Sequence, residues 1–83
     1  MPGKVKVKGK VLYREIGEKV YLARRRNGYT QDQLSESTGL DRTYISQIEN
    51  GKRNPSSKSL LELSRALGVG VGELLGQRRS KKR

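Results

Sequence analysis

Four glycines divide the centre of this chain into short stretches, and this division constrains the fold more than any other feature. Gly28, Gly39, Gly51 and Gly68 each follow a stretch in which apolar residues recur three or four positions apart. Such spacing puts the apolar side chains on one face of a helix, and glycine is the residue that most often ends a helix. The sequence therefore predicts an all-α fold.

Residues suited to capping helix starts lie between these stretches. Thr30, with Gln33 three positions later, forms a T-x-x-Q capping box, and Asp41 and Ser56 are suited to cap the two helices that follow them. A weaker fifth helix is expected around Val71, where glycines alternate with valines. The four stronger predicted helices cover residues 14–27, 31–37, 41–50 and 57–67. Together these elements predict a compact bundle of five short helices.

The composition excludes several classes of function. The chain has 83 residues, enough for one small domain, and contains neither cysteine nor histidine. Disulfides, thiolate or imidazole metal sites and histidine-based catalytic triads are therefore excluded, and we expect neither enzyme activity nor a cofactor. No apolar run is long enough for a membrane span or a signal peptide, so we expect a cytoplasmic protein associated with the nucleoid.

Most of the formal net charge of +11 lies at the two ends of the chain. Residues 1–14 contain five basic residues and no acid, as do residues 77–83, whereas the segment between them is nearly neutral. We expect a basic N-terminal arm over residues 1–13, a helical domain over 14–76 and a flexible basic tail over 77–83. Such a distribution favours a polyanionic partner such as nucleic acid.

The second and third predicted helices form the most informative unit. They are joined by Thr38-Gly39-Leu40, and a glycine in a short turn between two helices is typical of a helix-turn-helix. Leu34, Ile45 and Ile48 are spaced to hold the two helices together. Many helical hairpins share this spacing, so geometry alone leaves DNA binding open.

Longer motifs identify the unit more closely. The pattern R-x-x-x-G-Y-T-Q-x-x-L covers Arg24–Leu34, the run GLDRTYISQIENGKRNPS covers Gly39–Ser56, and L-x-x-LSRALGV follows. Residues 16–75 resemble a complete phage-repressor-type (Xre/Cro/C1, lambda-repressor-like) helix-turn-helix domain. The LDRTYIS run is also similar to the controller proteins of restriction–modification systems.

The resemblance implies a sequence-specific, double-stranded DNA-binding transcriptional regulator, most simply a repressor that binds a two-fold symmetric operator as a homodimer. Alternatives are a restriction–modification controller protein, which can also activate, and a DNA-binding antitoxin. An RNA-binding protein is disfavoured, because RNA readers stack bases on exposed aromatics and this chain has four tyrosines and no other aromatic residue. No small-molecule effector and no membrane are expected.

The outward face of the predicted third helix carries the candidate base-reading residues. With Ile45 and Ile48 facing inward, the outer face holds Thr43 and Gln47, with Ser46 at its edge and Arg42 in the first turn. Arginine can bind guanine through two hydrogen bonds, glutamine can do the same with adenine, and threonine can contact a thymine methyl group.

Phosphate contacts are expected from helix starts and loops. Thr30 and Gln31 open the second helix, where free N–H groups favour an anion, and the resemblance implies that Gln31 binds the DNA backbone. The other candidates follow or flank the reading helix and are Tyr44, Asn50, Lys52 and Arg53; a packed structural role is equally expected for Tyr44. Both basic ends are expected to lie along phosphates or in the minor groove.

Further roles concern structure and assembly. The resemblance implies a partly buried ion pair between Arg24 and Glu49, whereas Arg25 and Arg26 are expected to be solvated or near phosphates. The candidate dimer surface consists of Val69, Val71, Leu74 and Leu75; the two leucines are equally suited to complete the monomer core.

Two polar residues depart from the family pattern. Ser35 replaces a small alanine and Thr38 replaces an apolar residue before the turn. Both are small or able to satisfy their hydroxyl on the carbonyl four residues earlier, so they suggest modest stability rather than a lost fold. Gly70 replaces the usual polar cap of the last helix, which predicts a weakly ordered element there.

Overall fold

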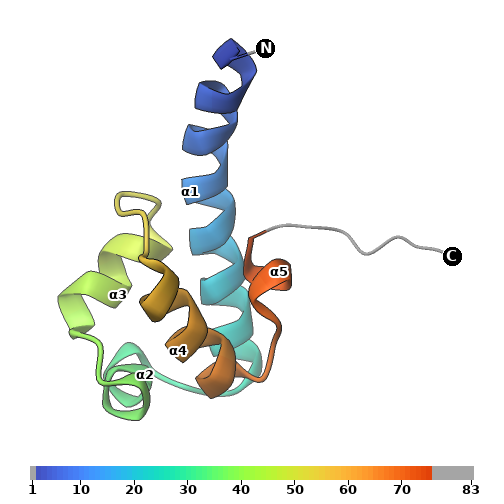
Figure 1. The fold of residues 1–83 in the computed structure, drawn as a ribbon. Coiled ribbons are helices and arrows are strands. Elements are labelled where there is room, and N and C mark those ends of the chain that lie inside the picture. The colour runs from blue at the N-terminus through green and yellow to red at the C-terminus, as the bar shows by residue number, and fades with distance from the viewer. Residues whose placement is uncertain (1, 76–83) are drawn as a thin grey trace, which may run out of the picture.

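The computed structural model describes residues 2–75, with side chains described from Tyr13 onward, and this part of the chain folds as five helices without a strand (Figure 1). The helices are α1 (Pro2–Arg26), α2 (Gln31–Thr38), α3 (Arg42–Glu49), α4 (Ser57–Leu67) and α5 (Val71–Leu74). The predicted all-α bundle is therefore confirmed.

Local capping explains where α2, α3 and α4 begin. The Thr30 side chain accepts a hydrogen bond from the Gln33 N–H while the Gln33 side chain accepts one from the Thr30 N–H, so the predicted capping box is present. Asp41 and Ser56 cap the other two helices through their side-chain oxygens. These interactions satisfy N–H groups that have no partner within the helix.

The first helix differs from the prediction. It begins at Pro2 rather than Arg14, so residues 2–13 extend α1 where the sequence predicts a separate basic arm. In Figure 1 this segment projects beyond the other helices. Extending a helix that is already packed avoids the cost of nucleation, and proline suits the first helical position. The predicted tail over 77–83 lies outside the described residues.

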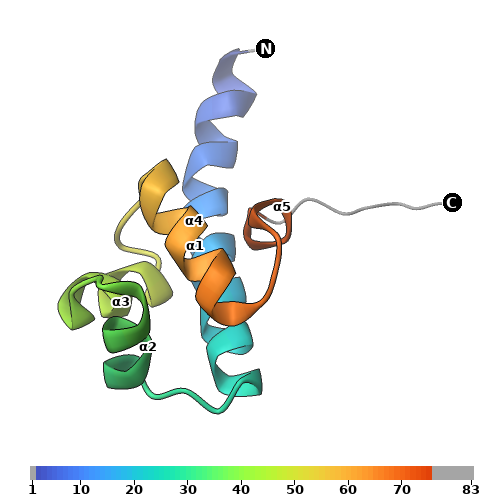
Figure 2. The ribbon, with the colours of Figure 1, turned by 60° about the horizontal axis from the view of Figure 1, so that its bottom comes forward.

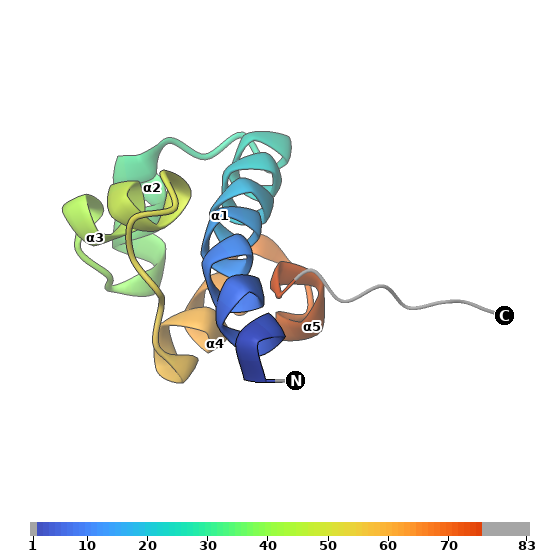
Figure 3. The same ribbon diagram turned by 90° about the horizontal axis from the view of Figure 1, so that it is seen from above.

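The core lies where α1 crosses the other helices. Figure 2 shows α2 and α3 on one side of α1 and α5 on the other, and the view from above in Figure 3 agrees. The buried apolar residues are Ile16, Val20, Ala23, Leu34, Ile45, Ile48, Leu60, Leu63, Leu67 and Leu74. They come from all five helices, so removing any one helix would expose this core.

A close approach between helices occurs at Gly17 of α1. A Cβ atom built on this residue would lie 2.9 Å from the carbonyl oxygen of Glu49 and closer still to that of Ile48. Only glycine therefore allows α1 to lie against the end of α3. Asn27 adds a second link, since its Nδ2 donates to the Leu67 carbonyl at 3.1 Å and joins α1 to α4.

The last helix completes the monomer. Gly70 provides no side-chain cap for α5, as expected. Leu74 is only 1% exposed and packs in the core, so of the two roles that the sequence left open for it, it completes the monomer core. Val69, Val71 and Leu75 are half-buried against the same core.

The hydroxyls of Ser35 and Thr38 differ in their partners. Thr38 Oγ1 donates to the Leu34 carbonyl four residues earlier at 2.8 Å, as predicted. Ser35 Oγ instead donates to the Leu40 carbonyl at 2.5 Å, outside its own helix. The Leu40 carbonyl precedes the α3 cap and lies outside the helical ladder, which leaves it free to accept. This hydrogen bond of Ser35 thus stabilises the turn between α2 and α3.

Within residues 2–75, no helix combines the length and apolar character that crossing a bilayer requires.

Candidate nucleic-acid interface

The third helix, α3, has one fully buried face and one polar face. Ile45 and Ile48 have no exposed surface. Of the candidate base-reading residues, Arg42 and Thr43 are exposed at the start of α3, and Ser46 and Gln47 are half-buried one turn later. The amphipathic pattern of α3 therefore presents polar side chains outward at the end of the helix that enters a DNA groove in helix-turn-helix proteins.

Arg42 is held loosely by an acidic neighbour. Its Nε lies 3.0 Å from Oδ1 of Asp32 on α2, and the two side chains are 63% and 76% exposed. An ion pair this exposed contributes little free energy. The guanidinium of Arg42 can therefore leave Asp32 for a base at small cost.

Gln47 is linked to the loop that follows α3. Arg53 Nε donates to Oε1 of Gln47 at 3.2 Å, and the Arg53 guanidinium lies 5.4 Å from the centre of the Tyr44 ring. Both Lys52 and Arg53 are exposed. Asn50 Nδ2 donates to the Ser46 carbonyl at 2.8 Å, so this predicted phosphate ligand also closes the last turn of α3.

Tyr44 has a packed role. Its hydroxyl donates to Ser59 Oγ at 3.0 Å and accepts from the Ser56 N–H at 3.2 Å. Burial raises the pKa of Tyr44, but hydrogen bonds with Ser59 and Ser56, together with the charge of Arg53, outweigh burial and lower the pKa overall. The phenol thus joins α3 to the start of α4. This is the structural role that the sequence offered as the alternative to a phosphate contact.

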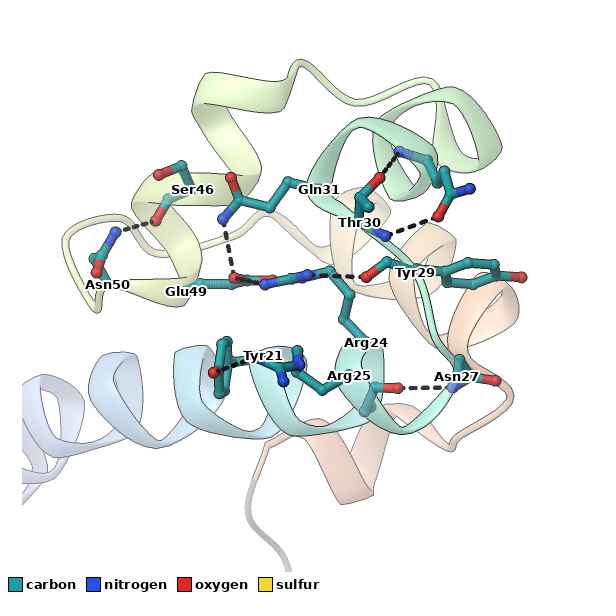
Figure 4. A network of polar contacts seen from close by, with 12 residues as sticks. Tyr21, Arg24, Arg25, Asn27, Tyr29, Thr30, Gln31, Ser46, Glu49 and Asn50 are labelled. Atoms are coloured by element: carbon teal, nitrogen blue, oxygen red, sulfur yellow. Dashed lines mark hydrogen bonds and ion pairs between the residues drawn. The ribbon is translucent and has the colours of Figure 1, made fainter.

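A polar network behind α3 joins three helices (Figure 4). Arg24 on α1 donates from Nε and Nη2 to the two carboxylate oxygens of Glu49 at 2.6 and 3.0 Å, and from Nη1 to the Tyr29 carbonyl at 2.9 Å. The side chains of Arg24 and Glu49 are 10% and 4% exposed. The hydrogen bond with Glu49 raises the pKa of Arg24 despite burial.

The same carboxylate holds Gln31. Gln31 Nε2 donates to Oε1 of Glu49 at 3.0 Å, which fixes the amide at the start of α2 (Figure 4). An amide nitrogen carries two hydrogens, so one remains for an outside acceptor. Thr30 is exposed beside it as the cap of α2.

An open hollow of about 400 Å³ lies at this point, where the end of α1 meets the start of α2. Gln31 and Arg42 both line it, so a candidate phosphate-binding residue and a candidate base-reading residue share one surface. The described residues contain no cluster of acidic side chains that could hold a metal ion.

Two structural features, Gly17 and the Asn27 bridge to α4, were not predicted from the sequence. Gly17 lies between Ile16 and Val20 on the buried face of the first helix. A glycine at such a position is a recognisable sign of close helix approach, because glycine weakens a helix and needs a packing reason to be there.

Comparison with known proteins identifies the family. Residues 20–74 match the family model of a helix-turn-helix domain. The chain belongs to this helix-turn-helix family. Control protein C.SmaI of Serratia marcescens is 40% identical over 60 residues, which cover 72% of this chain and 71% of that protein. The immunity repressor protein of Bacillus phage phi105 is 34% identical over 62 residues, covering 75% of this chain but 43% of the phage protein.

A solved structure shows the same arrangement. The restriction-modification controller protein C.AhdI of Aeromonas hydrophila superposes with a TM-score of 0.71 at 34% identity, over 75% of this chain and 94% of that one. The resemblance found in the sequence motifs is therefore confirmed for both groups of relatives that it suggested, repressors and controllers.

Proposed function

We propose that this chain is a sequence-specific, double-stranded DNA-binding transcriptional regulator that represses by occupying a two-fold symmetric operator as a homodimer. The observation that carries the proposal is the polar outer face of α3, presented by a helix whose opposite face is completely buried. The likeness to repressors and controller proteins supports it. The role needs no catalytic group or cofactor, and its site of action is DNA in the cytoplasm.

In this proposal the residues divide into two groups. Arg42, Thr43, Ser46 and Gln47 read base edges in the major groove. Residues at the start of α2 and around the loop after α3 bind phosphates; the candidates are Thr30, Gln31, Asn50, Lys52 and Arg53. Contacts with phosphates set the register of the protein, and contacts with base edges set its sequence preference.

A controller protein of a restriction–modification system is the second candidate function, favoured by the likeness to C.SmaI and C.AhdI. It would use the same DNA-binding surface, but it would also activate transcription from some positions. A reporter gene placed behind an operator selected from a pool of randomised DNA duplexes separates the two: repression at every operator position supports the repressor, and activation at any position supports the controller.

The proposed dimer would use the half-buried surface around α5, where Val69, Val71 and Leu75 remain candidates. A two-fold pair would place two copies of α3 about 34 Å apart, one turn of DNA. The operator would then be an inverted repeat.

The Arg42→Gln variant tests the reading role of α3. Removing a bidentate interaction with guanine should weaken binding to the selected operator by about 1–3 kcal/mol and relax the preference at one base pair in each half-site. Thermal unfolding should hardly change, because the Asp32 pair is exposed. Arg65→Gln, which removes an exposed arginine from α4, is the matched control. Equally weakened binding in the two variants would show that only total charge matters.

A further inference from the structure

We propose that Arg25 is an additional phosphate-binding residue and that Tyr21 positions it. The inference rests on the proposed DNA-binding function and adds a contact from α1 to those of α2 and α3. Three observations support it: Arg25 lines the hollow at the start of α2, it is positively charged, and its guanidinium donates a hydrogen bond to Tyr21.

The guanidinium of Arg25 contacts the tyrosine one turn earlier. Arg25 Nη1 donates to the Tyr21 hydroxyl at 2.9 Å, and the guanidinium carbon lies 5.6 Å from the centre of the Tyr21 ring. Figure 4 shows the two side chains beside the Arg24 network. Because the side chain of arginine is long and flexible, holding it in place lowers the entropy lost when it binds a ligand. Tyr21 therefore prepares Arg25 for binding.

Arg25 lines the hollow of about 400 Å³ together with Gln31 and Arg42. A phosphate bound by Gln31 would therefore lie on the surface to which Arg25 belongs. Arginine presents planar donors that match phosphate oxygens. With one Nη1 bond made to Tyr21, the other N–H groups of the guanidinium remain for such oxygens.

The charges around the hollow single out the same residue. Arg24 is neutralised by Glu49 at 2.6 Å, and Arg42 lies 3.0 Å from Asp32. Among the described side chains, Arg25 is the arginine of this lining that has no carboxylate within ion-pair distance. Arg25 therefore contributes to this lining a positive charge that no carboxylate of the described residues offsets.

The neighbouring arginine provides a matched comparison. Arg26 is also exposed on α1, but it lines a smaller hollow of about 140 Å³ with Leu22 and Glu73, on the side of α5. The two residues have the same charge and adjacent positions on the same helix, yet they face different surfaces. DNA binding through the surface of the larger hollow should therefore be more sensitive to Arg25 than to Arg26.

The experiment compares Arg25→Gln with Arg26→Gln in binding to a short DNA duplex carrying the site selected from a randomised pool, titrated between about 50 and 200 mM salt. For Arg25→Gln we expect roughly tenfold weaker binding, and a salt slope smaller by about 0.9 for each phosphate that is no longer neutralised. For Arg26→Gln we expect a smaller decrease in affinity and an almost unchanged slope. Equal effects of the two variants on affinity and slope would overturn the proposal.

Tyr21→Phe tests the positioning role, since it removes the hydroxyl and keeps the ring. Alone, this variant should weaken binding by a few-fold; in the Arg25→Gln background it should have no further effect. An effect of the same size in both backgrounds would show that Tyr21 acts independently of Arg25. Circular dichroism of each variant checks whether the fold is retained.

The failure of this inference is distinct from failure of the proposed function. If the unchanged chain binds no duplex in preference to others, sequence-specific DNA binding is wrong. If it binds its selected site and Arg25→Gln binds equally well with the same slope, only the role of Arg25 is wrong.

Discussion

Gly17→Ala should lower the free energy of unfolding by about 3 kcal/mol or more, one of the two largest effects that we expect from single substitutions. Alanine is more favourable than glycine inside a helix by about 1 kcal/mol, so helix propensity alone would make this substitution stabilising. The added Cβ, however, would lie 2.9 Å from the Glu49 carbonyl oxygen and even closer to that of Ile48. Both atoms belong to the backbone of α3, so α1 and α3 must separate.

Thermal unfolding measures this effect, which should lower the Tm by about 12 °C or more in a domain of this size. Gly70→Ala is the matched control, because nothing lies within 4 Å of a Cβ at that position and its φ of −78° suits any residue. The control should change stability by less than about 1 kcal/mol. A Gly17→Ala variant as stable as the parent chain would contradict the close packing of α1 against α3.

Glu49→Ala should destabilise the fold by roughly 3–5 kcal/mol, the range for removing one partner of a buried ion pair. The substitution removes the acceptor of two bonds from Arg24 and one from Gln31. Arg24, whose side chain is 10% exposed, would keep its bond to the Tyr29 carbonyl but lose its countercharge. The destabilisation comes mainly from this uncompensated charge and less from the pair's own net contribution.

Urea unfolding checks the value, and the double variant Arg24→Met with Glu49→Leu serves as its control. Replacing both charges with apolar side chains removes the uncompensated charge, so the double variant should be more stable than Glu49→Ala. If Glu49→Ala unfolds at the same urea concentration as the parent chain, the ion pair has no structural role. If the double variant is the less stable of the two, the uncompensated charge is not the cause of the destabilisation.

Features set by local interactions could be predicted from the sequence. The starts of α2, α3 and α4 follow from Thr30, Asp41 and Ser56, whose side chains reach N–H groups two or three residues later. The buried face of α3 follows from the spacing of Ile45 and Ile48. These features depend on few neighbouring residues, and the polar face of α3 follows from them.

Features set by contacts between distant elements could not be predicted. The extension of α1 to Pro2 depends on a helix already packed further along the chain. Leu74 and Leu75 have the same side chain, and only the path of α5 decides that Leu74 is the buried one. The bond from Gln31 to Glu49 depends on where α1 places Arg24. Arg25 and Arg26 at the end of α1 line different hollows, and this too depends on how α2 and α5 pack.

Selection of bound sites from a pool of randomised DNA duplexes, at about 150 mM salt where surface charges are screened, tests the proposed function most directly. We expect an inverted repeat with half-sites about one helical turn apart. We also expect Arg42→Gln to select sites with a relaxed preference at one position of each half-site. A bound pool without an enriched sequence would contradict sequence-specific recognition by α3, because binding would then come from charge alone.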